Sequence, residues 1–191
     1  MGRTGLFDLE KQFAFYGAYH NNPINIFIHT FLVWPLFFTS VLLFHFTPSL
    51  YSFPVYGLEL NLGFVFTLAY CLYYVKLDKK AGSLAALICI LCWVGASILG
   101  SELGFSKSWK VVLGGQFCSW AGQVVGHGIF EKRAPSDNFL EGLLTGPYFV
   151  LLELLHLAFG YEPYPGFQKS VKAKIEADIK DWKAKNQKKV S

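Results

Sequence analysis

The stretch Ile26–Phe46, IFIHTFLVWPLFFTSVLLFHF, decides the fold class of this chain. Its ionisable side chains are His29 and His45 alone. A helix needs about 20 predominantly apolar residues to cross the hydrocarbon core of a bilayer, which is roughly 30 Å thick. We therefore predict that this stretch forms a transmembrane α-helix.

Three further apolar segments extend this interpretation to most of the chain. They are Leu60–Val75, which is short unless Gly57 and Leu58 are included, the uncharged Ala81–Leu99, and Val111–Phe130. Hydrophobic residues make up 53% of the 191 residues, and charged residues make up 16%, compared with about 25% in an average soluble domain. The sequence therefore predicts an all-α, multi-pass transmembrane helical bundle with four spans, and it excludes a soluble domain.

A fifth apolar segment, Leu143–Phe159, differs from the other four. It contains Gly146, Pro147, Glu153 and His156, which are unusual in a lipid-facing helix. We expect this segment to re-enter the membrane or to lie buried in the bundle without crossing.

The distribution of Lys and Arg predicts the orientation, because loops rich in these residues stay on the cytosolic side. With four crossings and a cytosolic N-terminus, fifteen of the seventeen Lys and Arg lie on the cytosolic side, and Lys107 and Lys110 lie opposite. The loop 47–59 contains neither residue type, as expected of a translocated loop. Both termini are therefore expected in the cytosol.

A basic tail follows the membrane-embedded part. We expect a single catalytic domain over residues 1–165 and a cytosolic tail over 166–191. Apolar residues recur at helical spacing in the tail, which predicts an amphipathic helix on the membrane surface: Phe167, Val171, Ile175, Ile179 and Trp182. The last four residues, Lys188-Lys189-Val190-Ser191, resemble the dilysine address of endoplasmic reticulum membrane proteins, so we expect that location.

Histidines near the cytosolic face are the candidate functional residues. The N-terminal segment is predicted to be an interfacial helix that points His20 inward, because its apolar residues share one stripe with His20: Leu6, Leu9, Phe13 and Tyr16. His29 lies about one turn into the first span. Pro23 disfavours helix at Asn22, so we expect the chain to turn between these two histidines.

A polar stripe marks the fourth span. Spacings of four, three, four and four place five side chains on one helix face: Gln116, Trp120, Gln123, His127 and Glu131. Such a stripe must face protein or water within a bilayer. The adjoining faces carry Gly115, Gly122 and Gly126, which let neighbouring helices approach closely.

The predicted topology brings these two polar regions together. The first span leaves the cytosolic face and the fourth returns to it, so His20, His29 and His127 should converge there with Glu131. His45 lies at the opposite end of its helix and is excluded. Three histidines and a carboxylate favour a metal site. The structural alternative is buried histidines paired with backbone carbonyls or tyrosines.

Two signatures resemble those of a known membrane family. They are Tyr16-x-x-Tyr19-His20-x-x-Pro23-x-Asn25-x-x-Ile28-His29 and Trp120-x-x-Gln123-x-x-Gly126-His127-Gly128-x-Phe130-Glu131-x-Arg133-x-Pro135. They are similar to the signatures of the family that includes the fungal 2-hydroxy fatty acid dioxygenase of phytosphingosine breakdown. The resemblance extends from about Gly5 to Phe159. It departs at Pro135-Ser136-Asp137, where family members often have Pro-Ala-Leu, and His156 matches no family motif.

The resemblance implies an activity and its partners. It implies an endoplasmic reticulum enzyme that uses Fe(II) and molecular oxygen to shorten a 2-hydroxy fatty acid by one carbon. The expected partners are therefore a 2-hydroxy long-chain fatty acid, O2 and the lipid bilayer, with no nucleic acid. The sequence identifies no protein partner and no preferred chain length.

The roles of individual residues follow from the convergence together with the resemblance. His20, His29 and His127 are the predicted Fe(II) ligands, and Glu131 is predicted either to complete the ligand set or to orient His127. The predicted substrate-binding residues are Arg133, Lys132, Asn25, Gln123 and Tyr16. The alternative role of Arg133 and Lys132 is anchoring at the cytosolic interface.

Two other functions remain open at the level of sequence. Glu153 and His156 have the Glu-x-x-His spacing of di-iron bundles, and this leaves Glu153 as an alternative ligand, but the second such motif is missing. A non-catalytic lipid-binding or scaffold protein is the other alternative. Metal content separates the three functions, because they require about one iron, about two and none.

Overall fold

A computed structural model describes residues 5, 7–54, 57–133 and 139–190. These residues form helices and turns, with one isolated β-bridge between Ser52 and Glu59 and no strand among them. The elements in chain order are α1 (Leu9–Tyr19), α2 (Pro23–His45), α3 (Leu62–Leu77), α4 (Lys79–Leu103), α5 (Phe105–Val125), the π-helix η1 (Gly126–Glu131), α6 (Phe139–Phe159) and α7 (Phe167–Val190). The all-α prediction is confirmed.

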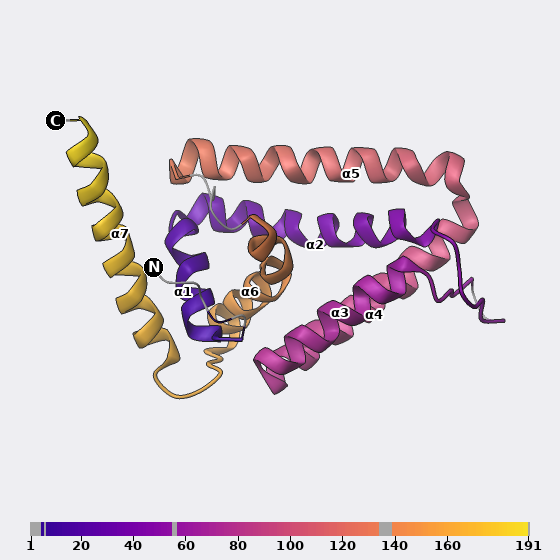
Figure 1. Ribbon diagram of the computed structural model, residues 1–191, viewed down its shortest axis with the longest axis horizontal. Coiled ribbons are helices and arrows are strands. Elements are labelled where there is room, and N and C mark those ends of the chain that lie inside the picture. The colour runs from indigo at the N-terminus through magenta and orange to yellow at the C-terminus, as the bar shows by residue number, and fades with distance from the viewer. Residues whose placement is uncertain (1–4, 6, 55–56, 134–138, 191) are drawn as a thin grey trace.

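Four helices form the body of the molecule and alternate in direction. Helices α2 and α5 run antiparallel side by side, and α3 and α4 form a hairpin whose helices both pack on α2 (Figure 1). Because the direction alternates, the start of α2 and the end of α5 meet at one end of the molecule. Helices α1 and α7 lie at that same end (Figure 1). The predicted convergence of the first and fourth spans is therefore present.

Glycines set the close approach of α2 and α5. A Cβ atom at Gly122 would lie 2.1 Å from Leu32 Cδ1, and one at Gly126 would lie 2.3 Å from Asn25 Oδ1. These separations are far shorter than real van der Waals contacts, so a larger residue would push the helices apart. The predicted role of the glycines on this helix is confirmed.

Three helices among the described residues are long and apolar enough to cross a membrane: α2, α4 and, over Gly142–Phe159, α6. Helix α3 is apolar but shorter. Helix α5, which carries the polar stripe together with Lys107 and Lys110, is not one of the three. The helices coincide with the predicted segments, while the number of crossings and the non-crossing arrangement of α6 stay predictions.

Both interfacial helices pack on the protein. Leu9, Phe13 and Tyr16 of α1 are buried, as the predicted stripe requires, and Leu6 lies outside the described residues. The N-terminal half of α7 packs on α1, where Phe167 and Val171 are fully buried. The first half of the apolar stripe of α7 therefore covers α1, while the membrane contact of this helix stays a prediction.

An acidic residue fastens α7 to α1. The Glu10 carboxylate of α1 accepts hydrogen bonds from Lys174, Ser170 and Tyr164. These donors, led by Lys174, lower the pKa of Glu10 from about 4.5 to about 2. Because the folded-state pKa is depressed, the stabilising contribution is complete above the unfolded value and is lost as the pH falls through about 2.

Candidate metal centre

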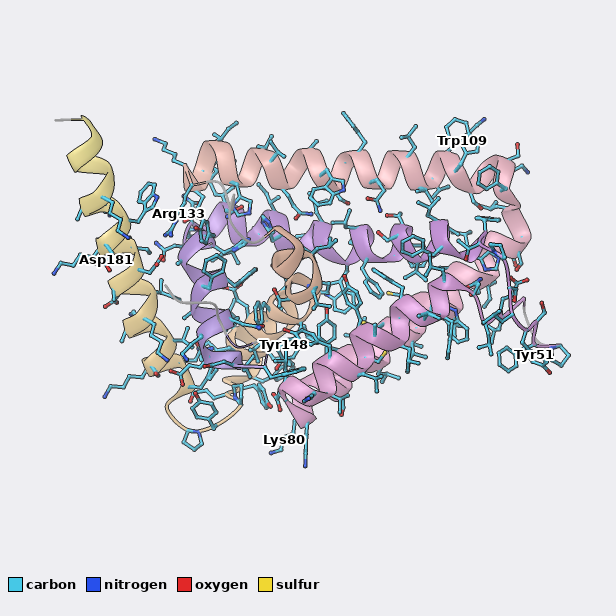
Figure 2. All side chains as sticks on the ribbon, in the orientation of Figure 1. Tyr51, Lys80, Trp109, Arg133, Tyr148 and Asp181 are labelled. Carbon is cyan, nitrogen blue, oxygen red and sulfur yellow. The ribbon has the colours of Figure 1, made fainter. Side chains whose placement is uncertain are left out.

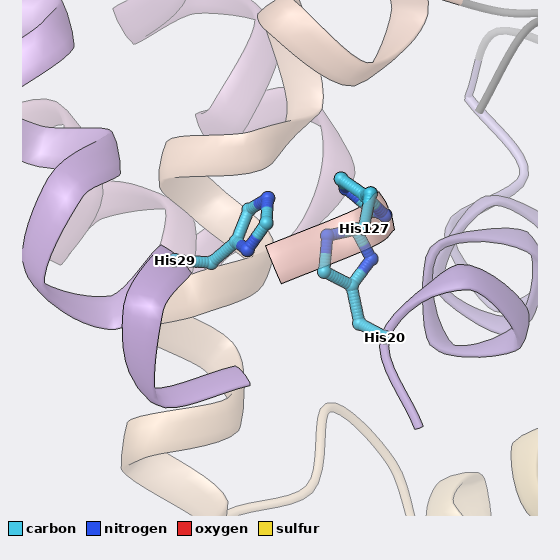
Figure 3. A group of neighbouring side chains, drawn as sticks. All are labelled: His20, His29 and His127. Carbon is cyan, nitrogen blue, oxygen red and sulfur yellow. The ribbon is translucent and has the colours of Figure 1, made fainter. Parts of the chain in front are cut away.

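Three histidines meet where α1, α2 and η1 come together. Their candidate ligand nitrogens all lie within 4.8 Å of one another, and the side chains of His20, His29 and His127 point toward a common centre (Figure 3). The ring centroids are 4.3 Å apart for His20 and His29, 4.7 Å for His20 and His127, and 4.8 Å for His29 and His127. In the described part of the chain, this is the one group of three or more His, Cys, Asp or Glu side chains close enough to share an ion.

The turn between α1 and α2 places the first two histidines. Helix α1 ends at Tyr19 with His20 as its C-cap, and α2 begins after Asn22, whose side chain accepts a hydrogen bond from the Ile24 N–H at 2.9 Å. Pro23 occupies the first position of α2, where its missing N–H costs no hydrogen bond. This short turn folds His20 back over the first turns of α2, beside His29.

A change of helix type places the third histidine. Helix α5 passes into the π-helix η1 at Gly126, and η1 ends at Glu131, followed by Lys132 in the left-handed conformation with φ 55°. Isolated π-helical turns are rare and occur frequently at functional sites. Because a π-helix has more residues per turn than an α-helix, residues beyond Gly126 leave the stripe that an uninterrupted α-helix would continue. His127, the second residue of η1, still reaches the centre, while Glu131 at the end of η1 bonds to the start of α2.

The hydrogen bonds of His20 and His29 define their tautomers. Nδ1 of His20 lies 2.8 Å from the Tyr16 carbonyl oxygen, and Nδ1 of His29 lies 2.9 Å from that of Asn25. A carbonyl only accepts, so each Nδ1 carries the proton and each Nε2 keeps its lone pair. This arrangement, with the other ring nitrogen bonded to a backbone carbonyl, is typical of metal-binding histidines.

Unpaired ring nitrogens at the centre fit a bound cation. His20 Nε2 and His127 Nδ1 are buried and have no hydrogen-bond partner among the described residues. Buried polar atoms in native proteins nearly always have a partner, and a metal ion would satisfy both atoms at once. Burial, together with the neighbouring His29 and His127, also holds the pKa of His20 well below its usual range, which keeps the neutral, metal-binding form.

Glu131 lies outside the histidine cluster. Its Oε2 accepts hydrogen bonds from the Asn21 N–H at 3.1 Å, the Asn22 N–H at 2.9 Å and the Asn25 amide at 3.2 Å. A carboxylate at a helix N-terminus also interacts favourably with the helix dipole. Glu131 thus ties the end of η1 to the start of α2, and the structure groups it with Asn25 rather than with the ligand nitrogens.

Asn25 is fully buried, and its side-chain NH2 group is occupied by protein contacts, while its Oδ1 has no hydrogen-bond partner among the described residues. Its amide group donates to the Tyr19 carbonyl oxygen at 3.1 Å as well as to Glu131. Asn25 therefore connects α1, α2 and η1 beneath the cluster, and it does not line the cavity described below.

The two basic residues after η1 do not reach the cluster. Arg133 donates to the Ala18 carbonyl oxygen at 3.1 Å and to the Asp178 carboxylate at 2.8 Å, and its guanidinium lies 4.0 Å from the centre of the Tyr19 ring. Figure 2 shows Arg133 beside α7. Lys132 is exposed. The structure thus places Arg133 as a connection between α1 and α7, away from the predicted substrate position.

An apolar slot of about 480 Å³ opens from the cluster. Tyr16, His20, His29, Gln123 and His127 line its polar end. The remainder is lined mainly by apolar side chains of α2, α3, α5 and α6, including Val33, Leu36, Phe37, Phe44, Phe66, Tyr70, Val124 and Leu143. A largely apolar cavity with a few polar groups at one end is the usual form of a binding site for a long-chain amphiphile.

Two predicted residues contribute unpaired polar atoms to that polar end. The Tyr16 hydroxyl and the Gln123 amide nitrogen are buried, and neither has a hydrogen-bond partner among the described residues. The Tyr16 ring also stacks on His20 with 3.9 Å between ring centroids. Both residues were identified from the signatures, and the structure brings both to the cluster.

The first part of the polar stripe, around Gln116, connects α5 to α2 and does not belong to the histidine cluster. Gln116 donates to the Leu36 carbonyl oxygen at 3.2 Å, to Thr39 at 3.0 Å and to Ser40 at 2.9 Å. Trp120 donates to Gln116 at 3.1 Å. The predicted stripe therefore divides into a packing part around Gln116 and a site part around Gln123 and His127.

A second cavity of about 1200 Å³ lies among α1, α6 and α7, and it shares Tyr16 and His20 with the slot. Glu153 and His156 line this second cavity. His156 contacts the Tyr161 carbonyl oxygen at 3.2 Å, and neither residue belongs to the histidine cluster. Their Glu-x-x-His spacing therefore does not bring them into the metal group.

Sequence reasoning missed the residues that line the apolar part of the slot. Phe66 and Tyr70 of α3 come from a segment that reads as uninterrupted membrane helix. An apolar wall residue looks like any other apolar residue until the helices are placed. The residue pattern therefore carried no signal that distinguishes them.

The fold and the cluster define a helical membrane protein with a candidate three-histidine metal centre at one end of an apolar slot. The family model for 2-hydroxy-palmitic acid dioxygenase Mpo1-like proteins matches residues 6–157. The 2-hydroxy-palmitic acid dioxygenase MPO1 of Saccharomyces cerevisiae is 32% identical over 177 residues, which is 92% of this chain and 91% of the yeast protein. No solved structure matches. This chain belongs to the Mpo1-like family.

Proposed function

We propose that this protein is an Fe(II)-dependent dioxygenase that converts a 2-hydroxy fatty acid and O2 into the fatty acid one carbon shorter, CO2 and water. The observation that carries the proposal is the cluster of His20, His29 and His127 at the polar end of an apolar slot. The yeast relative supports the substrate class, because it is a 2-hydroxy-palmitic acid dioxygenase. The reaction would belong to the α-oxidation that degrades sphingoid bases.

The three imidazoles would hold the metal. Neutral imidazole binds iron, zinc, copper and nickel, so the choice of iron comes from the oxygen chemistry and not from the ligands alone. When bound, iron supplies the electron transfer that activates O2 and a Lewis acid for the hydroxyl and carboxylate oxygens of the substrate. Glu131 and Asn25 would hold His29 and His127 in fixed positions relative to each other, because they join α2 to η1.

The protein would hold the substrate at both the polar end and the acyl end of the substrate molecule. Tyr16 and Gln123 offer unpaired hydrogen-bonding groups beside the histidines, so we assign them to the hydroxyl and carboxylate of the substrate. Arg133 is already paired with Asp178, and we therefore propose for it a structural role. The slot would bury the acyl chain and exclude water from the reacting end.

Product analysis tests this function. The full-length protein, purified without oxygen and reconstituted with Fe(II), should convert 2-hydroxy-palmitic acid and O2 into the acid one carbon shorter. The non-hydroxylated acid should give no product, because it lacks the hydroxyl that chelates the metal. Release of unchanged substrate by wild-type protein with iron bound would contradict the proposal.

We also propose that the protein resides in the endoplasmic reticulum membrane with both termini cytosolic. The alternating directions of α2, α3, α4 and α5 support this orientation, because they return the chain to the end where α1 and α7 lie (Figure 1). Protease added to sealed microsomes should remove a tag from either terminus. Protection of a C-terminal tag alone would show that α6 crosses the membrane.

A further inference from the structure

The apolar slot has a defined length. Its wall on α2 runs from His29 at the cluster through Val33 and Phe37 to Phe44. His29 and Phe44 are fifteen positions apart on the helix, which is roughly 22 Å at about 1.5 Å per residue. A chain that is held at the histidines can therefore extend along α2 for about that distance before it reaches Phe44.

Aromatic rings gather toward the far end of the slot. The ring of Phe66 on α3 lies 5.2 Å from Phe44, 5.6 Å from Phe37 and 4.6 Å from Tyr70, measured between ring centroids. Phe37 and Tyr70 also contact each other at 5.0 Å. All four residues line the slot, and we call them the aromatic cluster.

The aromatic cluster is held rigidly from three helices. Phe37 and Tyr70 are buried, and the Tyr70 hydroxyl donates to the Leu143 carbonyl oxygen of α6 at 3.2 Å. The rings make stacked, tilted and edge-to-face contacts with one another, and they cannot move aside without losing those contacts. Phe66, which is half-buried and contacts the half-buried Phe44, is therefore backed by the buried Phe37 and Tyr70.

We propose that the aromatic cluster sets the longest acyl chain that the protein accepts. This inference rests on the proposed function, which fixes the hydroxyl and carboxylate of the substrate at the histidines. With that end fixed, the number of carbons decides how close the terminal methyl comes to Phe44 and Phe66. A slot of roughly 22 Å fits an extended chain of about the length of 2-hydroxy-palmitic acid.

The length dependence has two parts. Each added methylene that still fits in the slot strengthens binding by up to about fourfold, because it leaves water. A methylene that would have to pass Phe44 and Phe66 finds no space, and pockets of this kind discriminate by roughly 10- to 200-fold. Affinity should therefore rise with chain length, reach a maximum and then fall sharply.

Equilibrium binding tests the proposal independently of turnover. The dissociation constants of 2-hydroxy acids of increasing length are measured anaerobically with full-length, iron-reconstituted protein. Phe44→Ala and Phe66→Ala should each move the tightest-binding length upward by several carbons. Relative affinity for acids longer than the wild-type optimum should rise at least about tenfold.

Two further variants complete the design. Gly146 lines the slot level with Val33, and a Cβ there would lie 3.7 Å from Val33 Cγ1, so Gly146→Leu should fill the slot and move the optimum to shorter acids. Phe64→Ala is the matched control, because Phe64 lies on α3 but packs on Trp93 and does not line the slot. Its length optimum should equal that of the wild type.

An unchanged length optimum in all three slot variants would overturn the proposal, as would the same shift in Phe64→Ala. The proposed function fails in a different way. If binding follows the predicted length dependence but the iron-loaded protein forms no shortened acid, the aromatic cluster limits a lipid-binding slot and the dioxygenase assignment is wrong.

Discussion

The two ends of α2 each carry a buried histidine, and the two histidines lie in different surroundings. His29 is 4% exposed near the start of the helix, and His45 is 8% exposed at its end. His29 meets His20 and His127, which come from other elements. His45 packs against Gly100, and its carbonyl oxygen accepts a hydrogen bond from Asn61 at 2.9 Å.

The difference between the ends shows what makes a buried histidine a candidate ligand. Both histidines are buried. Ring nitrogens without a hydrogen-bond partner among the described residues occur at both ends: on His20 and His127 beside His29, and on His45 itself. The distinguishing feature is convergence: three elements bring imidazoles to one point at the His29 end and to no such point at the His45 end.

Loss of a ligand should give the largest effect. His127→Ala should lower turnover by at least about 1000-fold while the protein stays folded in the membrane, because it removes one of three ligands. Adding His29→Ala should cost little more, since residues that act as a unit are strongly non-additive. Steady-state rates of the single and double variants measure this. Independent, multiplying losses would contradict a shared metal.

A methyl group added near each end of α2 should sharpen the comparison. Gly126→Ala would bring its Cβ to 2.3 Å from Asn25 Oδ1, so it should disturb the support of the cluster and weaken iron binding by about 10- to 100-fold. Gly100→Ala would bring its Cβ to 2.4 Å from the His45 ring. It should destabilise the fold by about 1 to 3 kcal/mol while iron binding persists.

Iron titration and thermal unfolding of both glycine variants separate these effects. Equal loss of iron affinity in the two variants would mean that the His45 end communicates with the centre, and the comparison would then fail.

The smallest effect is expected from His45→Gln. His45 lies sixteen residues along α2 from His29, which is roughly 24 Å, so it cannot share a ligand sphere with the cluster. Iron content and turnover should stay within about twofold of wild type. If His45→Gln were as damaging as His29→Ala while His20→Ala was silent, both the topology and the site would be wrong.

Much of this arrangement follows from local sequence patterns. The apolar runs predict the helices, and the turn at Pro23 together with the alternation of helices predicts that His20, His29 and His127 converge. Those features depend on residue spacing within a helix and on the alternating directions of successive helices, both of which can be read from the sequence. The helix-packing role of Gly122 and Gly126, which the structure confirms, could likewise be predicted from residue spacing.

The remaining features depend on contacts that spacing does not encode. The predicted polar stripe assumes an ideal α-helix, whereas Glu131 lies at the end of the π-helix η1 and bonds to the start of α2. Arg133 reaches Asp178 only because α7 docks on α1, a contact between residues 45 positions apart. The slot walls were likewise hidden, because Phe66 and Tyr70 resemble ordinary lipid-facing residues.

Metal content tests the central claim most directly. Full-length protein that is purified anaerobically, supplied with Fe(II) and freed of excess metal should retain about one iron per chain, and His20→Ala, His29→Ala and His127→Ala should each retain far less. His45→Gln should match the wild type. About two irons per chain would indicate a di-iron oxidase, and no iron in the wild-type protein would indicate a lipid-binding scaffold; either result would contradict the account.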